Sequence, residues 1–153
     1  MLPRWSQTFR IQAVDQKWEK MPATPGIYII MKKKPIKRIG GIDSNGILYV
    51  GKALTIRKRL GQFWSADHIA SDFLRMNLPL TRIFLGKWVD DEKDLYPLLG
   101  KLYVRIATPI SGKGKLDEAE WATLFAYVYR FGELPPLNFS LRKRWGVNPQ
   151  GAL

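Results

Sequence analysis

The pattern of apolar positions predicts a small antiparallel β-sheet of about three strands, flanked by helices in an α/β fold. Gly26–Met31 is β-branched and aromatic, which is typical of a strand, and residues 47–50 predict the returning strand. Residues 43–46, Asp-Ser-Asn-Gly, are a strong turn signal. The two strands should therefore form an antiparallel hairpin with a long connection, and residues 81–89 predict a third strand.

Apolar residues at helical spacing predict helices over residues 52–63, 95–106 and 116–131, and another from residue 65 to 73. The face that the helix over residues 116–131 should bury consists of Trp121, Leu124, Phe125 and Val128. Near the start of the chain, a short helical face is predicted from the spacing of Ile11, Val14 and Trp18.

The 153 residues predict a single domain, because no linker or internal repeat divides them. We expect its core at about residues 24–140, with basic extensions at both ends. The chain contains no apolar run long enough to span a bilayer, and its first residues lack the apolar stretch of a secretion signal. The sequence therefore predicts a cytoplasmic protein, intracellular and not secreted.

Charge is the first feature that points to a partner. The chain has 25 Lys and Arg against 13 Asp and Glu, a formal net charge of +12. This surplus favours nucleic acid, since each neutralised phosphate releases a counterion; a merely soluble basic protein and a basic membrane-surface protein are the alternatives. The chain has no cysteine and one histidine, His68, which excludes thiolate and His-rich metal sites.

Two tyrosines are the first candidates for chemistry. Tyr28 and Tyr49 lie on the two strands predicted to pair, so on a shared face their hydroxyls could meet around one water. A tyrosine with a pKa of roughly 10 is a weak base, and it needs nearby cations to stabilise its phenolate. Lys52 and Arg59 could supply them. Each tyrosine taken singly could equally be a packing residue, as strand tyrosines usually are.

Taken in order, these motifs resemble the GIY-YIG endonuclease family. The residues that carry the resemblance are Gly26-Ile27-Tyr28, Tyr49-Val50-Gly51-Lys52, the helix with Arg59, the helix with Glu120, and Pro135-Pro136-Leu137-Asn138. They span residues 26–138, most of the chain. The resemblance implies a metal-dependent endonuclease, a hydrolase that binds DNA and cuts its phosphodiester bonds with Mg²⁺ or Mn²⁺ as cofactor.

The resemblance also assigns roles within a catalytic set of Tyr28, Tyr49, Lys52, Arg59, Glu120 and Asn138. Tyr28 corresponds to the general base and Tyr49 to the residue that orients the attacking water. Lys52 and Arg59 would stabilise the phosphate charge. Glu120 would bind the metal, which suits a hydrated Mg²⁺ with few protein ligands. Asn138 is expected to order the wall of the site through its amide; a plain turn residue is its alternative reading.

Two of these assignments have neighbouring competitors. Arg57 and Arg59 are two residues apart, so on a helix they point about 200° apart and only one can face the site. We choose Arg59 for its family spacing from Tyr49 and expect Arg57 in solvent or on the DNA backbone. Glu118 competes in the same way with Glu120. Glu118 and Asp117 are interpreted as first-turn charges that favour the helix dipole.

Basic residues outside this set are predicted to contact DNA phosphates, with a solvated charge run as the alternative. They are Lys33, Lys34, Arg57, Arg142, Lys143 and Arg144. Three features depart from the family pattern: the long basic stretch between the tripeptides, the insertion-like residues 130–133, and Phe63 where many members have a histidine or tyrosine. The alternative function is therefore a catalytically inactive nucleic-acid-binding module with the same fold, and a basic scaffold for a protein partner is a third possibility.

Overall fold

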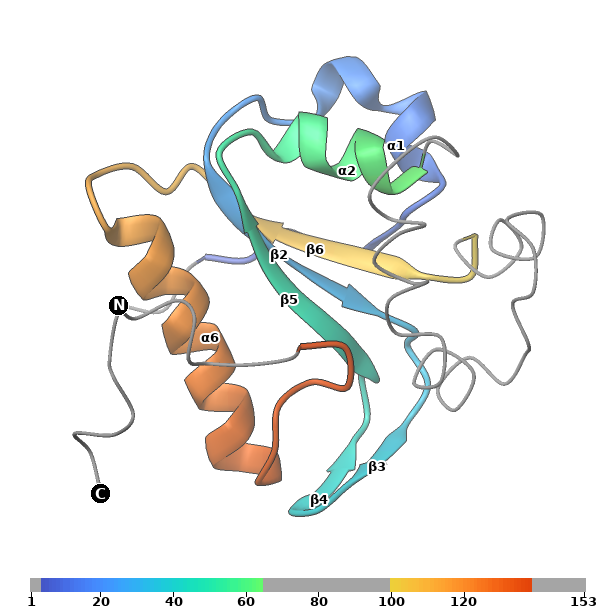
Figure 1. Cartoon of the computed structure of the whole chain (residues 1–153). Helices are drawn as coiled ribbons and strands as arrows, with labels where there is room; N and C mark the ends of the chain where they lie inside the picture. Colours follow the sequence, from blue (N-terminus) through green and yellow to red (C-terminus); the bar gives the residue numbers. More distant parts are fainter. Residues whose placement is uncertain (1–3, 65–99, 139–153) are drawn as a thin grey trace.

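The computed structural model describes residues 4–64 and 100–138 of the chain (Figure 1). Its fold is mixed α/β around a four-stranded antiparallel sheet with the strand order β1-β6-β2-β5. The strands are β1 (Phe9–Arg10), β6 (Tyr103–Ala107), β2 (Gly26–Met31) and β5 (Ile47–Ala53). All six residues of β2 are buried, as expected for an apolar strand that has a neighbour on each side.

The connection between β2 and β5 forms a hairpin of its own. It contains β3 (Ile36–Arg38) and β4 (Gly41–Asp43), which pair in a separate two-stranded sheet. The predicted pairing of β2 with β5 and the long connection are confirmed. The Asn45-Gly46 turn, however, leads from β4 into β5 rather than from β2 into β5. Gly46 adopts a positive φ of 63° there, a conformation that suits glycine.

Helices cover both faces of the sheet (Figure 1). α1 (Ala13–Gln16), the short 3₁₀ helix η1 (Trp18–Lys20) and α2 (Ile56–Trp64) lie on one side, and α6 (Lys115–Phe131) lies on the other. Two apolar clusters match this division. Tyr28 and Ile30 pack with α2 residues, whereas Ile29 and Val50 pack with Leu124 of α6. Because successive strand residues face opposite ways, β2 contributes to both clusters.

The prediction of a helix through residues 103–106 is wrong. These residues belong to β6, which pairs with β1 on one side and β2 on the other. Val104 and Ile106 are buried while Tyr103 and Arg105 are half-buried, so the segment has the period of two typical of a strand. The predicted helix at 65–73, the predicted strand at 81–89 and residues 95–99 lie outside the described residues.

The extent of α6 is confirmed, and its predicted buried face is confirmed in part: Leu124 is buried, Trp121 and Val128 are half-buried, and Phe125 is exposed. The buried residues are Glu120, Leu124, Tyr127 and Phe131, which follow a helical period. Apolarity alone favoured Phe125, which is 49 % exposed. The face of α6 that packs on the sheet differs from the predicted one because it includes the buried carboxylate of Glu120.

The N-terminal residues are part of the core rather than an extension from it. β1 pairs with β6, and Ile11 and Val14 are fully buried, which confirms the short helical face except at Trp18. Trp18 is 39 % exposed and contacts Gly61 of α2. None of the helices in the described ranges has the length and apolar character needed to cross a membrane.

Candidate functional site

The two candidate tyrosines share one face of the sheet. The β2–β5 register pairs Tyr28 with Gly51 and Ile30 with Tyr49, so Tyr28 and Tyr49 are diagonal neighbours on that face. Their ring centroids are 6.0 Å apart, with an angle of 46° between the planes. A hydrogen bond also links the two side chains. The structure therefore brings the two phenols together.

Gly51 leaves room for both rings. A Cβ atom built at this position would lie 2.5 Å from Cζ of Tyr28 and 2.6 Å from Cε1 of Tyr49. Gly51 lies inside β5, which continues to Ala53 and so beyond the predicted end of the strand at residue 50. Gly51 thus allows the side chains of Tyr28 and Tyr49 to lie close to the strand backbone.

The surroundings of Tyr28 favour its neutral hydroxyl. Burial is the largest cause that raises its pKa above the ordinary value, followed by the neighbouring Tyr49 and, more weakly, the charge of Glu120. The charge of Arg59 acts in the opposite direction but does not offset them. The expected effect of a nearby cation is therefore present from Arg59, but burial outweighs it in the protein alone.

Arg59 and Arg57 leave α2 in different directions. The charge of Arg59 acts on Tyr28 and lowers its pKa, against the larger effect of burial. Arg57 donates from Nε to the carbonyl oxygen of Met21 at 2.8 Å and from Nη2 to that of Glu19 at 2.9 Å. Arg57 is thus tied to the N-terminal segment, and of the two arginines Arg59 is the one whose charge lowers the pKa of Tyr28.

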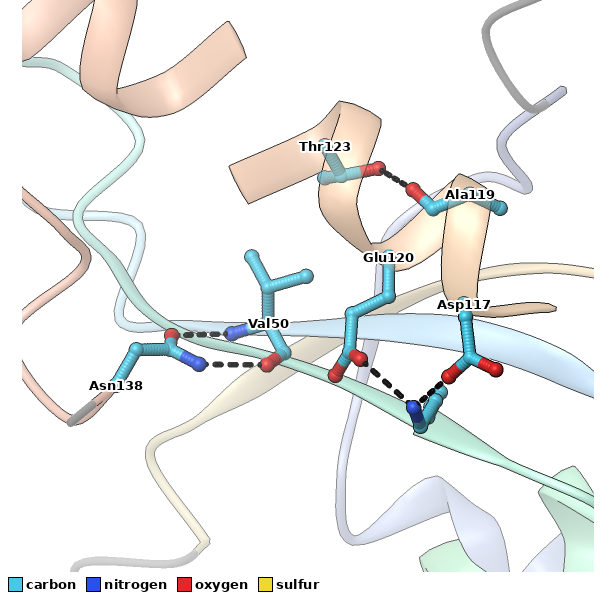
Figure 2. Close-up of polar contacts among 7 residues, drawn as sticks. Val50, Asp117, Ala119, Glu120, Thr123 and Asn138 are labelled. Carbon is cyan, nitrogen blue, oxygen red and sulfur yellow. Dashed lines mark hydrogen bonds and ion pairs between the residues drawn. The ribbon is translucent and has the colours of Figure 1, made fainter. Parts of the chain in front are cut away.

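Lys52 pairs with two carboxylates of α6, Asp117 and Glu120, which are labelled in Figure 2. Its Nζ atom is 3.3 Å from Oε2 of Glu120, and it also forms an ion pair with Asp117. The three side chains differ in exposure: 2 % for Glu120, 31 % for Lys52 and 54 % for Asp117. Burial lowers the pKa of the Lys52 ammonium, but its hydrogen bonds and ion pairs with Asp117 and Glu120 outweigh this and raise the pKa overall.

Asp117 is the residue that sequence reasoning missed. It was interpreted as a first-turn charge, yet its carboxylate contacts Lys52 one turn before Glu120. A spacing of three residues on a predicted helix was the available signal, since such residues share a face. Glu118 pairs with Lys115 at 2.8 Å instead, so the geometry favours Glu120 over Glu118.

Asn138 binds the backbone of β5. Its side-chain oxygen accepts a hydrogen bond from Val50 N at 2.9 Å, and its side-chain nitrogen donates one to Val50 O at 2.8 Å (Figure 2). Leu137 N also donates to Leu48 O at 2.9 Å. The amide thus satisfies the outer edge of β5 beside Gly51 and Lys52, as expected for a residue that orders the site wall.

These residues form what we call the β5 cluster: Tyr28, Tyr49, Lys52, Arg59, Asp117 and Glu120. Lys52 pairs with Ile27 in the register, so it faces α6, whereas the tyrosines face α2. The cluster therefore includes both sides of β5, and the charge of Glu120 still reaches Tyr28. Glu120 and Asp117 are hard oxygen donors, the ligand type that Mg²⁺ takes in small numbers while keeping bound waters. Within residues 4–64 and 100–138, no group of three or more His, Cys, Asp or Glu side chains could hold a metal.

The predicted DNA contacts have different surroundings. Lys33 has a positive φ of 52° and its ammonium lies 4.8 Å from the ring centroid of Tyr103, and Lys34 is exposed. Arg142, Lys143 and Arg144 lie outside the described residues, as do His68 and the side chain of Phe63. Contact with DNA stays a prediction for all of them.

The two stretches that lengthen the family spacing pack against each other. Gly40 N donates to Phe131 O at 2.8 Å, and Ile39 N donates to Oε1 of Glu133 at 2.9 Å. Arg38, at the end of the basic stretch, pairs with Glu133 at 3.1 Å and donates to Leu134 O at 2.6 Å. The buried side chain of Arg38 thus has a structural role and is not a phosphate contact. The two stretches that lengthen the family spacing form one structural feature, because they bind each other.

No family model matches the chain, and no curated protein matches it. The geometry of the β5 cluster and the motif resemblance are therefore what indicate a function for the chain.

Proposed function

We propose that the chain is a metal-dependent endonuclease of the GIY-YIG type that hydrolyses phosphodiester bonds in DNA. The observation that carries this proposal is the β5 cluster itself. Two phenols, a guanidinium, an ammonium and a buried carboxylate gather around one strand, although they come from positions as distant as 28 and 120. The net charge of +12 supports a polyanionic substrate.

In this proposal the side chains divide the work of hydrolysis. Tyr49 and the neutral hydroxyl of Tyr28 bind and orient the attacking water. Tyr28 can take the proton of the attacking water only after its own hydroxyl proton has passed to bulk solvent, and the charge of Arg59 favours that loss. Arg59 offers a planar fork to the phosphate oxygens and stabilises the charge that develops there.

Glu120 is the proposed metal ligand, with Asp117 close by. A divalent cation bound at Glu120 would supply charge neutralisation for the phosphate and the leaving oxygen. Lys52 holds the Glu120 carboxylate in place and compensates its charge in the metal-free protein. Asn138 keeps β5 in position through its paired hydrogen bonds with Val50.

A plasmid-nicking assay with a single isosteric substitution tests this function. Glu120→Gln keeps the shape of the side chain but removes the negative charge that would hold the cation. We expect cleavage of supercoiled DNA in Mg²⁺ to fall about 10³-fold or more, while DNA affinity stays within about twofold. EDTA should stop the wild-type reaction.

Glu118→Gln is the matched control, because it removes the same charge two residues away from a side chain that pairs with Lys115. It should cleave like wild type. Full Mg²⁺-dependent cleavage by Glu120→Gln would refute the metal role of Glu120.

The second candidate is a nucleic-acid-binding module without catalysis. Two observations favour it: Lys52 pairs with the proposed metal ligand, and burial raises the pKa of Tyr28. Salt-dependent DNA binding by the wild type, with no nicking in Mg²⁺ or Mn²⁺, would support this candidate over the endonuclease. An absence of salt-dependent DNA affinity would exclude both.

A further inference from the structure

The Lys52 ammonium has two partners of different character. Glu120 is buried and fixed in the packed face of α6, whereas Asp117 lies one turn earlier and is more than half exposed. Both carboxylates project from the same helix toward the same nitrogen (Figure 2). Because an ammonium has three donors, Lys52 can hold both carboxylates at once or turn toward either one.

A cation at Glu120 would compete with Lys52 for the same carboxylate. The buried charge of Glu120 needs a compensating partner, which Lys52 supplies in the metal-free protein. A divalent cation at that position would repel the ammonium strongly at such short range. Metal binding thus requires the ammonium to move away from Glu120. The Asp117 carboxylate, with which the ammonium already pairs, can then hold it alone.

We infer that Asp117 is a positioning residue that accepts the Lys52 ammonium and frees Glu120 for a divalent cation. This inference rests on the proposed metal role of Glu120 and deepens it, since it explains how one buried carboxylate can serve a lysine and a metal in turn. The exposure of Asp117 suits this role, because an exposed carboxylate can accept the ammonium with little further desolvation. Its place on the same helix face keeps Lys52 beside the site after the exchange.

Mn²⁺ binding by the whole chain without DNA tests the inference, with the EPR signal of free Mn²⁺ as the readout. Asp117→Asn removes the alternative partner but leaves Glu120 and Lys52 in place. We expect its Mn²⁺ dissociation constant to rise by about two- to fivefold, the range that a partly exposed ion pair can contribute. Asp117→Glu, which restores the charge, should recover most of this loss.

Three further variants separate this role from others. Glu118→Gln removes an equal charge that pairs with Lys115, and it should bind Mn²⁺ like wild type. Lys52→Met removes the competing ammonium, so adding Asp117→Asn in that background should change Mn²⁺ affinity little. An equal loss in that background would mean that Asp117 acts directly on the metal, which would overturn the positioning role.

The failure of this inference is distinguishable from the failure of the metal assignment. If Asp117→Asn binds Mn²⁺ like wild type while Glu120→Gln does not, the positioning role is wrong and the metal role of Glu120 stands. If wild type binds no more Mn²⁺ than Glu120→Gln does, both are wrong. The Asp117→Asn measurement can still overturn the inference where Lys52→Met fails to fold, since the Asp117 and Glu118 side chains are exposed.

Discussion

Helix α6 contributes to two polar clusters of similar composition, and they use their charges differently. Toward its N-terminal end lies the β5 cluster. Toward its C-terminal end lies what we call the hairpin cluster: Arg38, Asp43, Tyr127 and Glu133. Each contains a tyrosine whose pKa is raised, first by burial and then by neighbouring groups that include a carboxylate. Residue types alone do not distinguish the two.

Hydrogen bonding distinguishes them. Oδ1 of Asp43 accepts from the backbone N–H of Asn45 and Gly46, and Oδ2 accepts from Ile47 N and the Tyr127 hydroxyl at 2.8 and 3.0 Å. Both carboxylate oxygens of Asp43 thus accept hydrogen bonds. Three of these bonds hold the turn before β5, and the fourth joins that turn to α6. Its partners are mostly backbone groups, which cannot move away without unfolding the turn.

The β5 cluster has partners that can exchange. Lys52 shares its ammonium between two carboxylates, whereas Arg38 is only 6 % exposed and tied to Glu133 and Leu134. A site that takes up a substrate or cation needs groups whose present partners can be replaced. The comparison therefore indicates a structural role for the hairpin cluster and favours a functional role for the β5 cluster.

The largest expected effect on stability comes from removing the Asp43 carboxylate. Asp43→Ala leaves several buried donors without an acceptor, so the free energy of unfolding should fall by about 3–5 kcal/mol. Urea denaturation measures this loss. Glu120→Ala removes the carboxylate of the other cluster in the same way, and it should cost less because Lys52 keeps Asp117 as a partner. Equal losses in both variants would break the distinction between the clusters.

A methyl group at Gly51 should disturb the β5 cluster alone. Gly51→Ala places a Cβ atom 2.5 Å from the present position of the Tyr28 ring, so the tyrosine pair must move. We expect the cleavage rate to fall about 10- to 100-fold, because misplacement of reacting groups by about 1 Å has effects of this size. Unchanged cleavage would show that hydrolysis does not depend on this tyrosine arrangement. Thermal unfolding serves as the check on folding.

Asn138→Ala tests how far the wall of β5 supports the site. The variant loses both hydrogen bonds with Val50, which should lower the free energy of unfolding by about 1–2 kcal/mol. Chemical denaturation measures this loss, and cleavage should fall by a smaller factor than in Gly51→Ala. A cleavage loss as large as that of Glu120→Gln would instead give Asn138 a direct part in the reaction.

The smallest effect concerns Tyr127 and pH. Its pKa is raised by burial and by Asp43, so its contribution to stability is fully present below the ordinary tyrosine pKa of about 10 and is lost as pH rises above it. Tyr127→Phe should lower the free energy of unfolding by about 1 kcal/mol at neutral pH. It should also reduce the fall in stability above about pH 10, measured by urea denaturation across that range. A variant with the same alkaline profile as wild type would contradict this account.

Several elements could be predicted from the sequence because their signals are local. The β-branched run at 26–31 predicted β2, and helical spacing predicted α6. The resemblance also favoured Arg59 over Arg57 and Glu120 over Glu118, and in the structure Arg57 binds the N-terminal segment and Glu118 pairs with Lys115. A separation of two residues on a helix requires the side chains of Arg57 and Arg59 to point in different directions. In the structure they interact with different groups, Arg57 with the carbonyl of Met21 and Arg59 with Tyr28.

Other features depend on contacts between distant residues. The pattern of apolar residues at 103–107 fits either a helix or a strand. Pairing with β1 on one side and β2 on the other stabilises the strand. The buried face of α6 depends on burying the charge of Glu120, which Lys52 compensates from another element. The role of Asp117 depends on the same contact.

The sequence by itself determined β2 and β5, the extent of the long helix and the set of candidate residues, because periodicity and motif order are properties of neighbouring positions. Only the tertiary structure decided that the basic Arg38 is buried against Glu133, that Asp43 serves a turn, and that Lys52 lies between two carboxylates. The physical reason is that the behaviour of a charged group depends on its burial and its partners, and both are set by residues far away in the chain.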